Sequence, residues 1–452
     1  MYERLLTGDR IRASTRGQKG ISEEVESDRA RVLYSAAFRR LQRKTQVFPL
    51  EDNASVRTRL THSLEVAHVG RFLASSVLKL IRDQGLTKSF GLENVDFQHA
   101  LSVTVEVACL LHDIGNPPFG HFGEFAISEW FRKKEPLSQP FADLRDFDGN
   151  PQGFRIVSRL NGADGLTGMN LTLSQLAATM KYPSNPDERE RFKKFGVFLS
   201  EKDVMAQVRA KFNLQPEQRF PLAYLMEAAD DISYCLSDIE DGVEKRIVSH
   251  KEIVADLLEQ APNDEIRALI TEAKEAAEKA SSVDEAVTFR STLVRKLVEH
   301  AASTYISQHN EILAGEPKEL IDENSAEGKL LSLIKHVVRN KVYTDSSIQS
   351  LELAGMSVIT GLLEKFGRLL DLSRDEFLAL LPKSGRVRGK DVEKRLVGFI
   401  ADRHLIVYKT MADECSEIEE KWHRAHLIVD YISGMTDPFA LKMHQTLGGT
   451  RL

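Results

Sequence analysis

The sequence predicts an all-α protein. Apolar residues recur at alternating steps of four and three in one stripe formed by Leu225, Ala229, Ile232, Leu236 and Ile239, the spacing of one face of a helix. Strand-like alternation of apolar and polar residues is scarce along the chain. Hydrophobic residues make up 42% and charged residues 28% of the 452 residues, a balance typical of a globular protein with a buried core.

The helical segments follow one another in a definite order. We expect a helical block at 26–130 that ends in a turn with two prolines. Residues 131–220 are rich in Pro, Gly, Asn and Asp but also carry recurrent Phe and Leu, which indicates loops and short helices folded over the site. A helix ending near residue 245 closes the core. The highly charged segment 250–310 predicts a solvated outer hairpin, and 325–440 predicts a C-terminal block.

Charge and cysteine content restrict the function classes. The formal net charge of −6 argues against global attraction to polyanions, although the first sixty residues hold 13 Lys and Arg against 8 Asp and Glu. Cys109, Cys235 and Cys415 form no CxxC pair, so we expect reduced thiols in a cytoplasmic protein. The polar N-terminus does not resemble a signal peptide. The longest apolar run, near 100–111, is shorter than the ~20 residues that span a bilayer, so no membrane association is expected.

One stretch concentrates residues that can carry metal chemistry. His112 and Asp113 end an apolar helical run, and His121 and Glu124 follow in a Gly-rich turn. Packing alone does not require two His, an Asp and a Glu in so short a segment. Mixed imidazole and carboxylate ligands suit Mn²⁺, Fe²⁺, Co²⁺ or Mg²⁺, which would polarise a phosphoryl oxygen or activate a bound water.

Further candidate ligands lie elsewhere in the chain. His62 lies in an Arg-Thr-Arg-Leu-Thr-His segment, and Asp230 and Asp231 lie opposite the apolar stripe on their helix, together with Tyr234. The helical wheel does not choose between the two aspartates. The order His, His-Asp, Asp along the chain is the pattern of the HD superfamily of metal-dependent phosphohydrolases, which it resembles.

A more specific resemblance covers nearly the whole chain. Five segments are similar to deoxyguanosine triphosphate triphosphohydrolases, with the weakest likeness at about 131–220 and 250–325. The segments that carry the resemblance are 38–49, 57–65, 112–124, 227–238 and 430–437. It implies an N-terminal basic helical segment (1–54), an HD metal-binding core (55–245) with a loop-rich insertion at about 131–220, and a C-terminal helical region (246–452) that completes the nucleotide pocket.

The resemblance implies a reaction and a set of site residues. The reaction is hydrolysis of dGTP at the α-phosphorus to deoxyguanosine and inorganic triphosphate. One divalent metal per subunit is implied, Mn²⁺ or Mg²⁺ first and Fe²⁺ or Co²⁺ as alternatives. The implied metal ligands are His62, His112, Asp113 and Asp230, and the implied catalytic pair is His121 and Glu124, in which the carboxylate would fix the imidazole tautomer.

The substrate supplies the remaining expectations. A triphosphate carries about four negative charges and needs fixed cations beside the metal. The candidates are Arg57, Arg59 and Lys181, with Arg43 and Lys44 behind them. By the resemblance, Tyr234 lies under the deoxyribose, where a ring against C2′ excludes a hydroxyl. The other expected substrate contacts are Gln46 and Val47 near the sugar and base, Asp238 on the helix of Tyr234, and Glu352 with Arg386 for guanine.

Other readings stay open. One is a broad deoxynucleoside triphosphate triphosphohydrolase or a 5′-nucleotidase with little base preference. Another is a regulator that binds single-stranded nucleic acid, in which the basic N-terminal stretch and the loop at 382–390 form a phosphate track. The complete ligand set favours an enzyme, since a binding module does not need His121 and Glu124. The resemblance also implies a homo-oligomer, expected as a hexamer, and single-stranded DNA as an effector.

Overall fold

The computed structural model describes residues 1–14, 17, 19–134, 143–162, 164–280, 285–317, 319–382 and 388–451. Within these ranges the protein is built from helices and has no β-strand. Its only extended pairings there are two isolated bridges, which join Arg10 to Thr172 and Thr45 to Thr58. The prediction of an all-α fold is therefore confirmed.

The helices have these bounds. The first half of the chain forms α1 (Tyr2–Leu5), α2 (Ile21–Leu33), α3 (Ala36–Arg40), η1 (Leu41–Arg43), α4 (Arg59–Asp83), α5 (Thr87–Phe90), α6 (Val95–Leu111), α7 (Gly120–Lys133), η2 (Leu144–Asp146), α8 (Gly149–Arg155), η3 (Ile156–Leu160), α9 (Leu173–Thr179), η4 (Leu199–Glu201), α10 (Lys202–Phe212) and α11 (Pro221–Glu244). The second half forms α12 (His250–Glu259), α13 (Asp264–Lys279), α14 (Glu285–Ser307), α15 (His309–Ala314), α16 (Ala326–Lys341), α17 (Ser346–Gly367), η5 (Arg368–Asp371), α18 (Arg374–Leu380), α19 (Asp391–Phe399), α20 (Asp402–Met411), α21 (Glu417–Ser433) and α22 (Asp437–Leu447).

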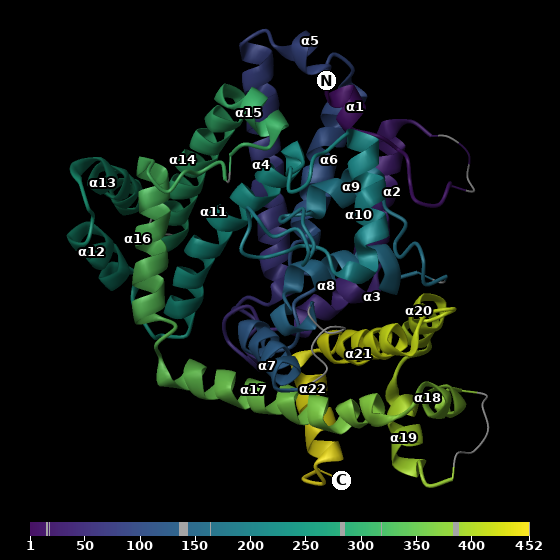
Figure 1. The fold of residues 1–452 in the computed structure, drawn as a ribbon. Helices are drawn as coiled ribbons and strands as arrows, with labels where there is room; N and C mark the ends of the chain where they lie inside the picture. Colours follow the sequence, from purple (N-terminus) through teal and green to yellow (C-terminus); the bar gives the residue numbers. More distant parts are fainter. Residues whose placement is uncertain are drawn as a thin grey trace.

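Three long helices, α4, α6 and α11, pack together at the centre of the larger body (Figure 1). Gly70 permits this approach, because a Cβ at that position would overlap Cys109 Sγ and also contact Ala229. The side chain of Thr58 accepts a hydrogen bond from Thr61 N and caps α4, which fixes where that helix begins. The candidate metal ligands lie in the first turn of α4, just after the end of α6 and in the middle of α11.

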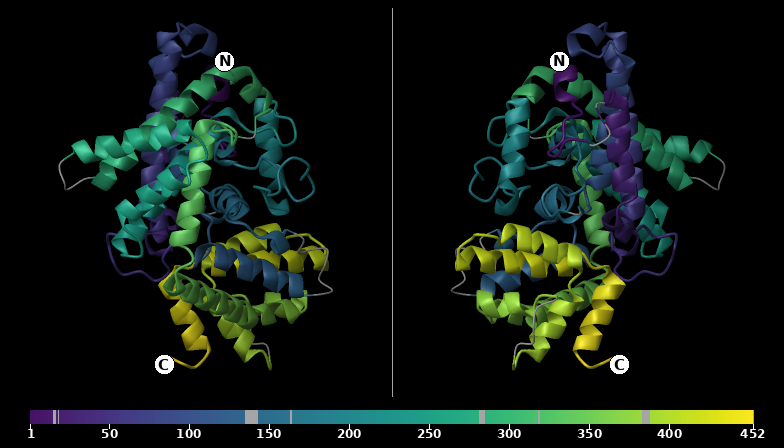
Figure 2. Two further views of the ribbon diagram at one scale, coloured as in Figure 1. Left: turned by 90° about the vertical axis from the view of Figure 1, so that its left-hand side faces the viewer. Right: turned by 90° about the vertical axis from the view of Figure 1, so that its right-hand side faces the viewer.

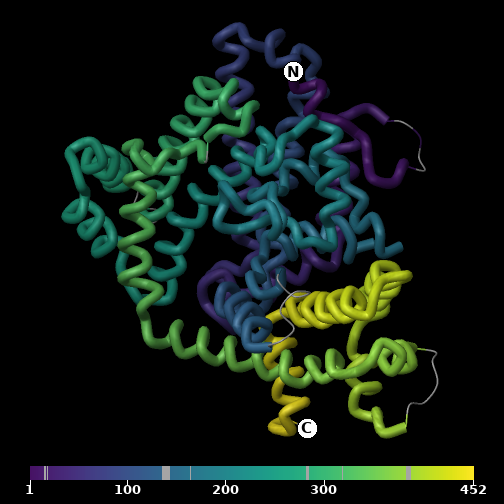
Figure 3. The backbone as a smooth tube through the Cα atoms, in the orientation of Figure 1, coloured from purple at the N-terminus to yellow at the C-terminus, as the bar shows by residue number. Residues whose placement is uncertain are grey.

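A second body lies at one end of the molecule and contains α17 to α22 (Figure 2). Its apolar core also includes residues of α7, which packs along α17. The Trp130 ring lies against Gly367, where a Cβ would overlap it, and Trp130 Nε1 donates to Glu364 at 2.7 Å. The tube in Figure 3 shows α17 running from the end of α16 across this body.

Each of the two apolar cores contains residues from more than one of the predicted ranges 1–54, 55–245 and 246–452. This division into domains remains a prediction. Helices α12 to α16 contribute to the core of the larger body, whereas α7 contributes to the other. Helices α12 and α13 lie at the outside of the molecule, as the charged sequence suggests (Figure 1). The last part of the segment 250–310 is not a solvated outer hairpin, because α14 packs on α4 and buries Phe289, Leu293 and Tyr305. Among the described residues, no helix is both long and apolar enough to cross a membrane.

Candidate metal centre and active site

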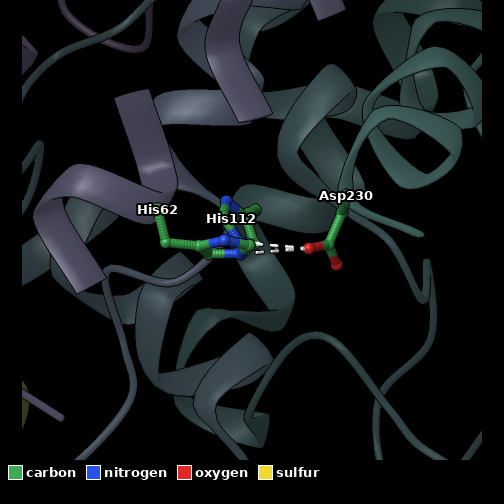
Figure 4. Close-up of side chains that lie close together, drawn as sticks. All are labelled: His62, His112 and Asp230. Carbon is green, nitrogen blue, oxygen red and sulfur yellow. Dashed lines mark ion pairs between the residues drawn. The ribbon is translucent and has the colours of Figure 1, made fainter. Parts of the chain in front are cut away.

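Three of the candidate ligands converge from three helices. His62 comes from α4, His112 from the end of α6 and Asp230 from α11. One ligand atom of each lies within 4.8 Å of the others. Asp230 Oδ1 is 3.5 Å from His62 Nε2 and 3.4 Å from His112 Nε2 (Figure 4). The helical wheel does not distinguish Asp230 from Asp231, and Asp230 is the one of the two that lies in this cluster.

The imidazole of His112 is prepared to act as a ligand. Its Nδ1 lies 2.7 Å from the carbonyl oxygen of Cys109 and donates to it, so Nε2 is the nitrogen that faces Asp113 and Asp230. That Nε2 is buried without a hydrogen-bond partner among the described residues. Burial lowers the pKa of His112, but Asp113 and Asp230 outweigh it and raise the pKa to about 9. The carboxylates therefore favour positive charge at this point, which a divalent cation supplies.

Asp113 lies beside this group in a different environment. Its Oδ2 is 3.5 Å from His112 Nε2 and accepts a hydrogen bond from Arg59 Nη1 at 2.6 Å, while Oδ1 accepts from Asn116 Nδ2 at 2.6 Å. Burial opposes its ionisation, but the charges of Arg59 and His112 hold the pKa of Asp113 well below its usual range. Asp113 is thus an ionised carboxylate at the edge of the cluster.

Glycines bring the turn after α6 into place. A Cβ at Gly115 would overlap the backbone of Gly149 and Gly153 at the start of α8. A Cβ at Gly149 would in turn overlap Asn116 Oδ1. The Gly-rich character of the motif therefore reflects direct backbone contact between the α6–α7 turn and α8, which no larger residue permits.

His121 and Glu124 form a pair in the first turn of α7. His121 Nδ1 is 2.8 Å from Glu124 Oε2, and Glu124 Oε1 accepts a hydrogen bond from Gly149 N at 2.8 Å. The bond to Glu124 raises the pKa of His121 above its usual value. His121 is otherwise exposed to the pocket. The backbone of α8 orients the carboxylate, and the carboxylate orients the imidazole.

These groups line one pocket of about 1080 Å³, part of it open to solvent. Its lining includes the candidate metal ligands, the His121–Glu124 pair and several cationic side chains. Lys181 Nζ is 3.8 Å from Asp230 Oδ2, and the charges of Glu227 and Asp230 raise the pKa of Lys181 despite its burial. The predicted residues that line the pocket are Gln46, Arg59, His62, His112, Asp113, His121, Glu124, Lys181, Asp230 and Tyr234.

Sequence reasoning missed several lining residues. Lys194 and Lys335 add two cations and pair with Asp148 and Asp231. No periodicity or motif marks these lysines, since Lys194 lies in the loop-rich insertion and Lys335 lies on α16. The remaining lining residues not predicted are Asn116, Asn150, Thr179, Tyr182 and Met226.

Some predicted substrate contacts lie elsewhere. Arg57 does not line the pocket, because its guanidinium pairs with Glu65, Glu240 and Asp241. This places Arg57 in a structural ion-pair network on α4 and α11. Val47 is buried outside the lining, and Lys44 Nζ donates to the carbonyl oxygens of Asn116 and Ser433.

Three further predicted contacts, Asp238, Glu352 and Arg43, are not among the residues that line the pocket. The Asp238 carboxylate is buried behind Tyr234 and bonds to the hydroxyl of Tyr343, which also lies 2.8 Å from the Tyr234 hydroxyl. Burial raises the pKa of Asp238 to about 7. Glu352 is half-buried on α17, with its pKa raised by burial and opposed by the charge of His121. Arg43 is exposed on η1, and Arg386 lies outside the described residues.

A helical core in which three helices bring His, His-Asp and Asp to one point defines a protein of the HD class. The family model described as "HD domain" matches residues 59–235, and the one described as "Phosphohydrolase-associated domain" matches residues 382–446. The chain is 38% identical to deoxyguanosinetriphosphate triphosphohydrolase of Klebsiella pneumoniae (strain 342), over 95% of this chain and 94% of the relative. It is 37% identical to the protein of the same name from Enterobacter sp. (strain 638), over 93% of each.

The chain therefore belongs to the deoxyguanosinetriphosphate triphosphohydrolase family. The resemblance found in the sequence motifs is confirmed. Membership of an HD family implies a divalent metal, and the buried, unpartnered Nε2 of His112 beside Asp230 fits such an ion.

Proposed function

We propose that this protein hydrolyses dGTP to deoxyguanosine and inorganic triphosphate in a metal-dependent reaction. The observation that carries the proposal is the shared pocket of the His62–His112–Asp230 cluster and the His121–Glu124 pair. The names of the relatives support the substrate and the site of cleavage. Broad deoxynucleotide specificity is the alternative, and the same assay distinguishes the two.

In the proposed site, His62, His112, Asp113 and Asp230 hold one divalent ion, with Mn²⁺ or Mg²⁺ as the first candidates and Fe²⁺ or Co²⁺ as alternatives. When bound, such an ion polarises a phosphoryl oxygen and lowers the pKa of a ligated water. Asp113 differs from the others in that both of its carboxylate oxygens already accept hydrogen bonds, Oδ2 from Arg59 and Oδ1 from Asn116, each at 2.6 Å. We therefore expect Asp113 to share one oxygen, with Oδ2 the first candidate, between the ion and its present donor.

His121 is proposed to move the proton. Since Nδ1 is held by Glu124, Nε2 is the nitrogen that exchanges a proton with water or with the leaving 5′-oxygen. Glu124 fixes the tautomer and stabilises the imidazolium form, in agreement with the raised pKa of His121. Neither residue is needed to hold the ion.

Arg59, Lys181, Lys194 and Lys335 are proposed to bind the triphosphate, because all four line the pocket. Arg57 is not expected to bind the triphosphate, because its guanidinium group already forms ion pairs with three carboxylates. Gln46 Oε1 is buried at the pocket wall without a partner among the described residues. This acceptor suits a sugar hydroxyl donor, while Tyr234 packs against the deoxyribose. Roles for Val47, Asp238, Glu352 and Arg386 remain expectations.

Product analysis tests the proposal. The enzyme is incubated with each dNTP and NTP in Mn²⁺ or Mg²⁺, and both products are identified. The expected products are deoxyguanosine and inorganic triphosphate, with dGTP hydrolysed fastest. Release of inorganic phosphate with a nucleoside diphosphate would contradict the proposal, and equal rates for all dNTPs would favour broad specificity.

Metal content tests the ligand assignment with a matched control. His62→Ala is expected to lose bound metal and activity together. His68→Ala removes an exposed histidine six residues further along α4 and is expected to retain both. The proposed homo-oligomer, expected as a hexamer, is checked by light scattering, and the effect of single-stranded DNA is checked in the same rate assay.

A further inference from the structure

A small cavity lies where the two bodies of the molecule meet, apart from the active site. It is lined by residues of α3, η3, α20 and α21, and it measures about 260 Å³ with its opening to solvent included. On the same measure it has about a quarter of the volume of the active-site pocket. Arg40 comes from α3, and Arg403 and His404 come from the first turn of α20.

The two arginines of this cavity have no ion-pair partner among the described residues. Among the residues that the structure describes, neither Arg40 nor Arg403 forms an ion pair or a hydrogen bond through its side chain, and Arg40 Nε is buried without a partner. Asp430 also lines the cavity, but its carboxylate is held by Arg155 Nε at 2.9 Å and Arg155 Nη2 at 2.8 Å, and by Gln152. The carboxylate of Asp430 is therefore paired with Arg155, which it shares with Glu201, and not with either arginine of the cavity.

Unpaired charges held together cost free energy unless a ligand relieves them. Burial, together with the charges of Arg403 and Arg39, lowers the pKa of Arg40 to about 10. His404 is 8% exposed, and its Nδ1 has no partner among the described residues. Helix α20 begins with these residues and has no side-chain cap.

We propose that Arg40, Arg403 and His404 form a binding site for one phosphoryl group of a small ligand, separate from the catalytic pocket. Two guanidinium groups and an imidazole offer the donors that phosphate oxygens accept. The interior of the cavity has room for about one water molecule, so the phosphoryl group would lie at its mouth, between the two guanidinium groups. The ligand is free phosphate or the phosphate of a nucleotide whose sugar and base remain outside the cavity.

The test measures binding to the metal-loaded, full-length protein by calorimetry at low ionic strength. The probes are inorganic phosphate, a nucleoside monophosphate and a single-stranded oligonucleotide. Arg403→Ala is expected to weaken phosphate binding at least about tenfold, the loss of one charge-assisted hydrogen bond. Lys409→Ala makes the same charge change at an exposed position of α20 and is expected to leave binding unchanged.

A second measurement guards against loss of folding and against binding in the active site. In phosphate-free buffer, Arg403→Ala is expected to melt at the same temperature as the wild type or higher, because it removes repulsion from Arg40. A lower melting temperature would reveal a structural partner and overturn the proposal. So would phosphate binding that depends on Lys181 rather than Arg403, or binding of the oligonucleotide alone. Tighter site-dependent binding of the monophosphate would identify a nucleotide as the source.

Discussion

Asp437 joins the C-terminal motif to the active site, and its removal makes a measurable prediction. The carboxylate is 2% exposed. It accepts hydrogen bonds from Thr45 N at 2.9 Å, from Phe119 N at 3.1 Å and from the Thr45 hydroxyl. Thr45 precedes Gln46, and Phe119 precedes the turn of α7 that carries His121. One side chain therefore anchors two segments of the pocket wall.

Asp437→Ala would leave two buried backbone N–H groups without an acceptor, whereas the Thr45 hydroxyl is free to rotate. Each orphaned donor costs about 1–3 kcal/mol, so the free energy of unfolding is expected to fall by about 2–6 kcal/mol. Asp437→Asn keeps one acceptor oxygen and is expected to lose about half as much. The assay is urea unfolding followed by circular dichroism, with kcat/KM for dGTP measured under folding conditions.

Asp264→Ala is the matched control. Asp264 is the first residue of α13, as Asp437 is of α22, but it is exposed. Its replacement removes only the favourable interaction with the helix dipole, worth roughly 0.3–1 kcal/mol. If Asp437→Ala destabilised the protein no more than Asp264→Ala, the anchoring role would be refuted. Full activity in Asp437→Ala would refute the link to the pocket wall.

Three further predictions follow from the site and the core. His121→Ala is expected to lose orders of magnitude in kcat but to retain its metal, and loss of metal by elemental analysis would instead make His121 a ligand. Tyr234→Ala is expected to narrow the ratio of kcat/KM for dGTP over GTP, mainly by raising KM for dGTP; an unchanged ratio would place 2′-discrimination elsewhere, with Gln46 the first candidate. Burial lowers the pKa of His309 to about 4 from 6.5. Between pH 6.5 and about 4 the unfolded state therefore binds a proton at His309 that the folded state does not bind. Stability is expected to fall by about 3 kcal/mol as pH drops through that window, and His309→Phe should flatten this part of a pH series of urea unfolding curves.

The sequence predicted best those features that local pattern determines. The stripe of α11 is buried as its spacing indicates, and it presents Asp230 to the cluster. The His112-Asp113 pair lies at the end of α6, where the turn with Gly115 and two prolines begins, as the sequence indicates. Helical periodicity and turn residues act over a few positions, so a single sequence carries them.

Features set by contacts between distant segments were not predictable in this way. Arg57 and Arg59 look equivalent beside the His62 motif, yet one pairs with Glu65, Glu240 and Asp241, and the other reaches Asp113. The direction of the Arg57 side chain depends on α11, more than 180 residues further on, and that of Arg59 depends on Asp113, 54 residues further on. Lys194 and Lys335 reach the pocket only through the packing of the insertion and of α16.

The proposed catalytic pair and the proposed metal ligands belong to different packing units. His62, His112 and Asp230 are carried by the core of α4, α6 and α11, whereas His121 and Glu124 begin α7, which shares its apolar core with α17. A small slide of one unit over the other would change the separation of proton donor and metal while leaving each group intact. We therefore expect the turnover rate to depend on the contact between the two bodies. Substitutions along that contact, far from any reacting atom, can alter kcat without altering how tightly the metal is held.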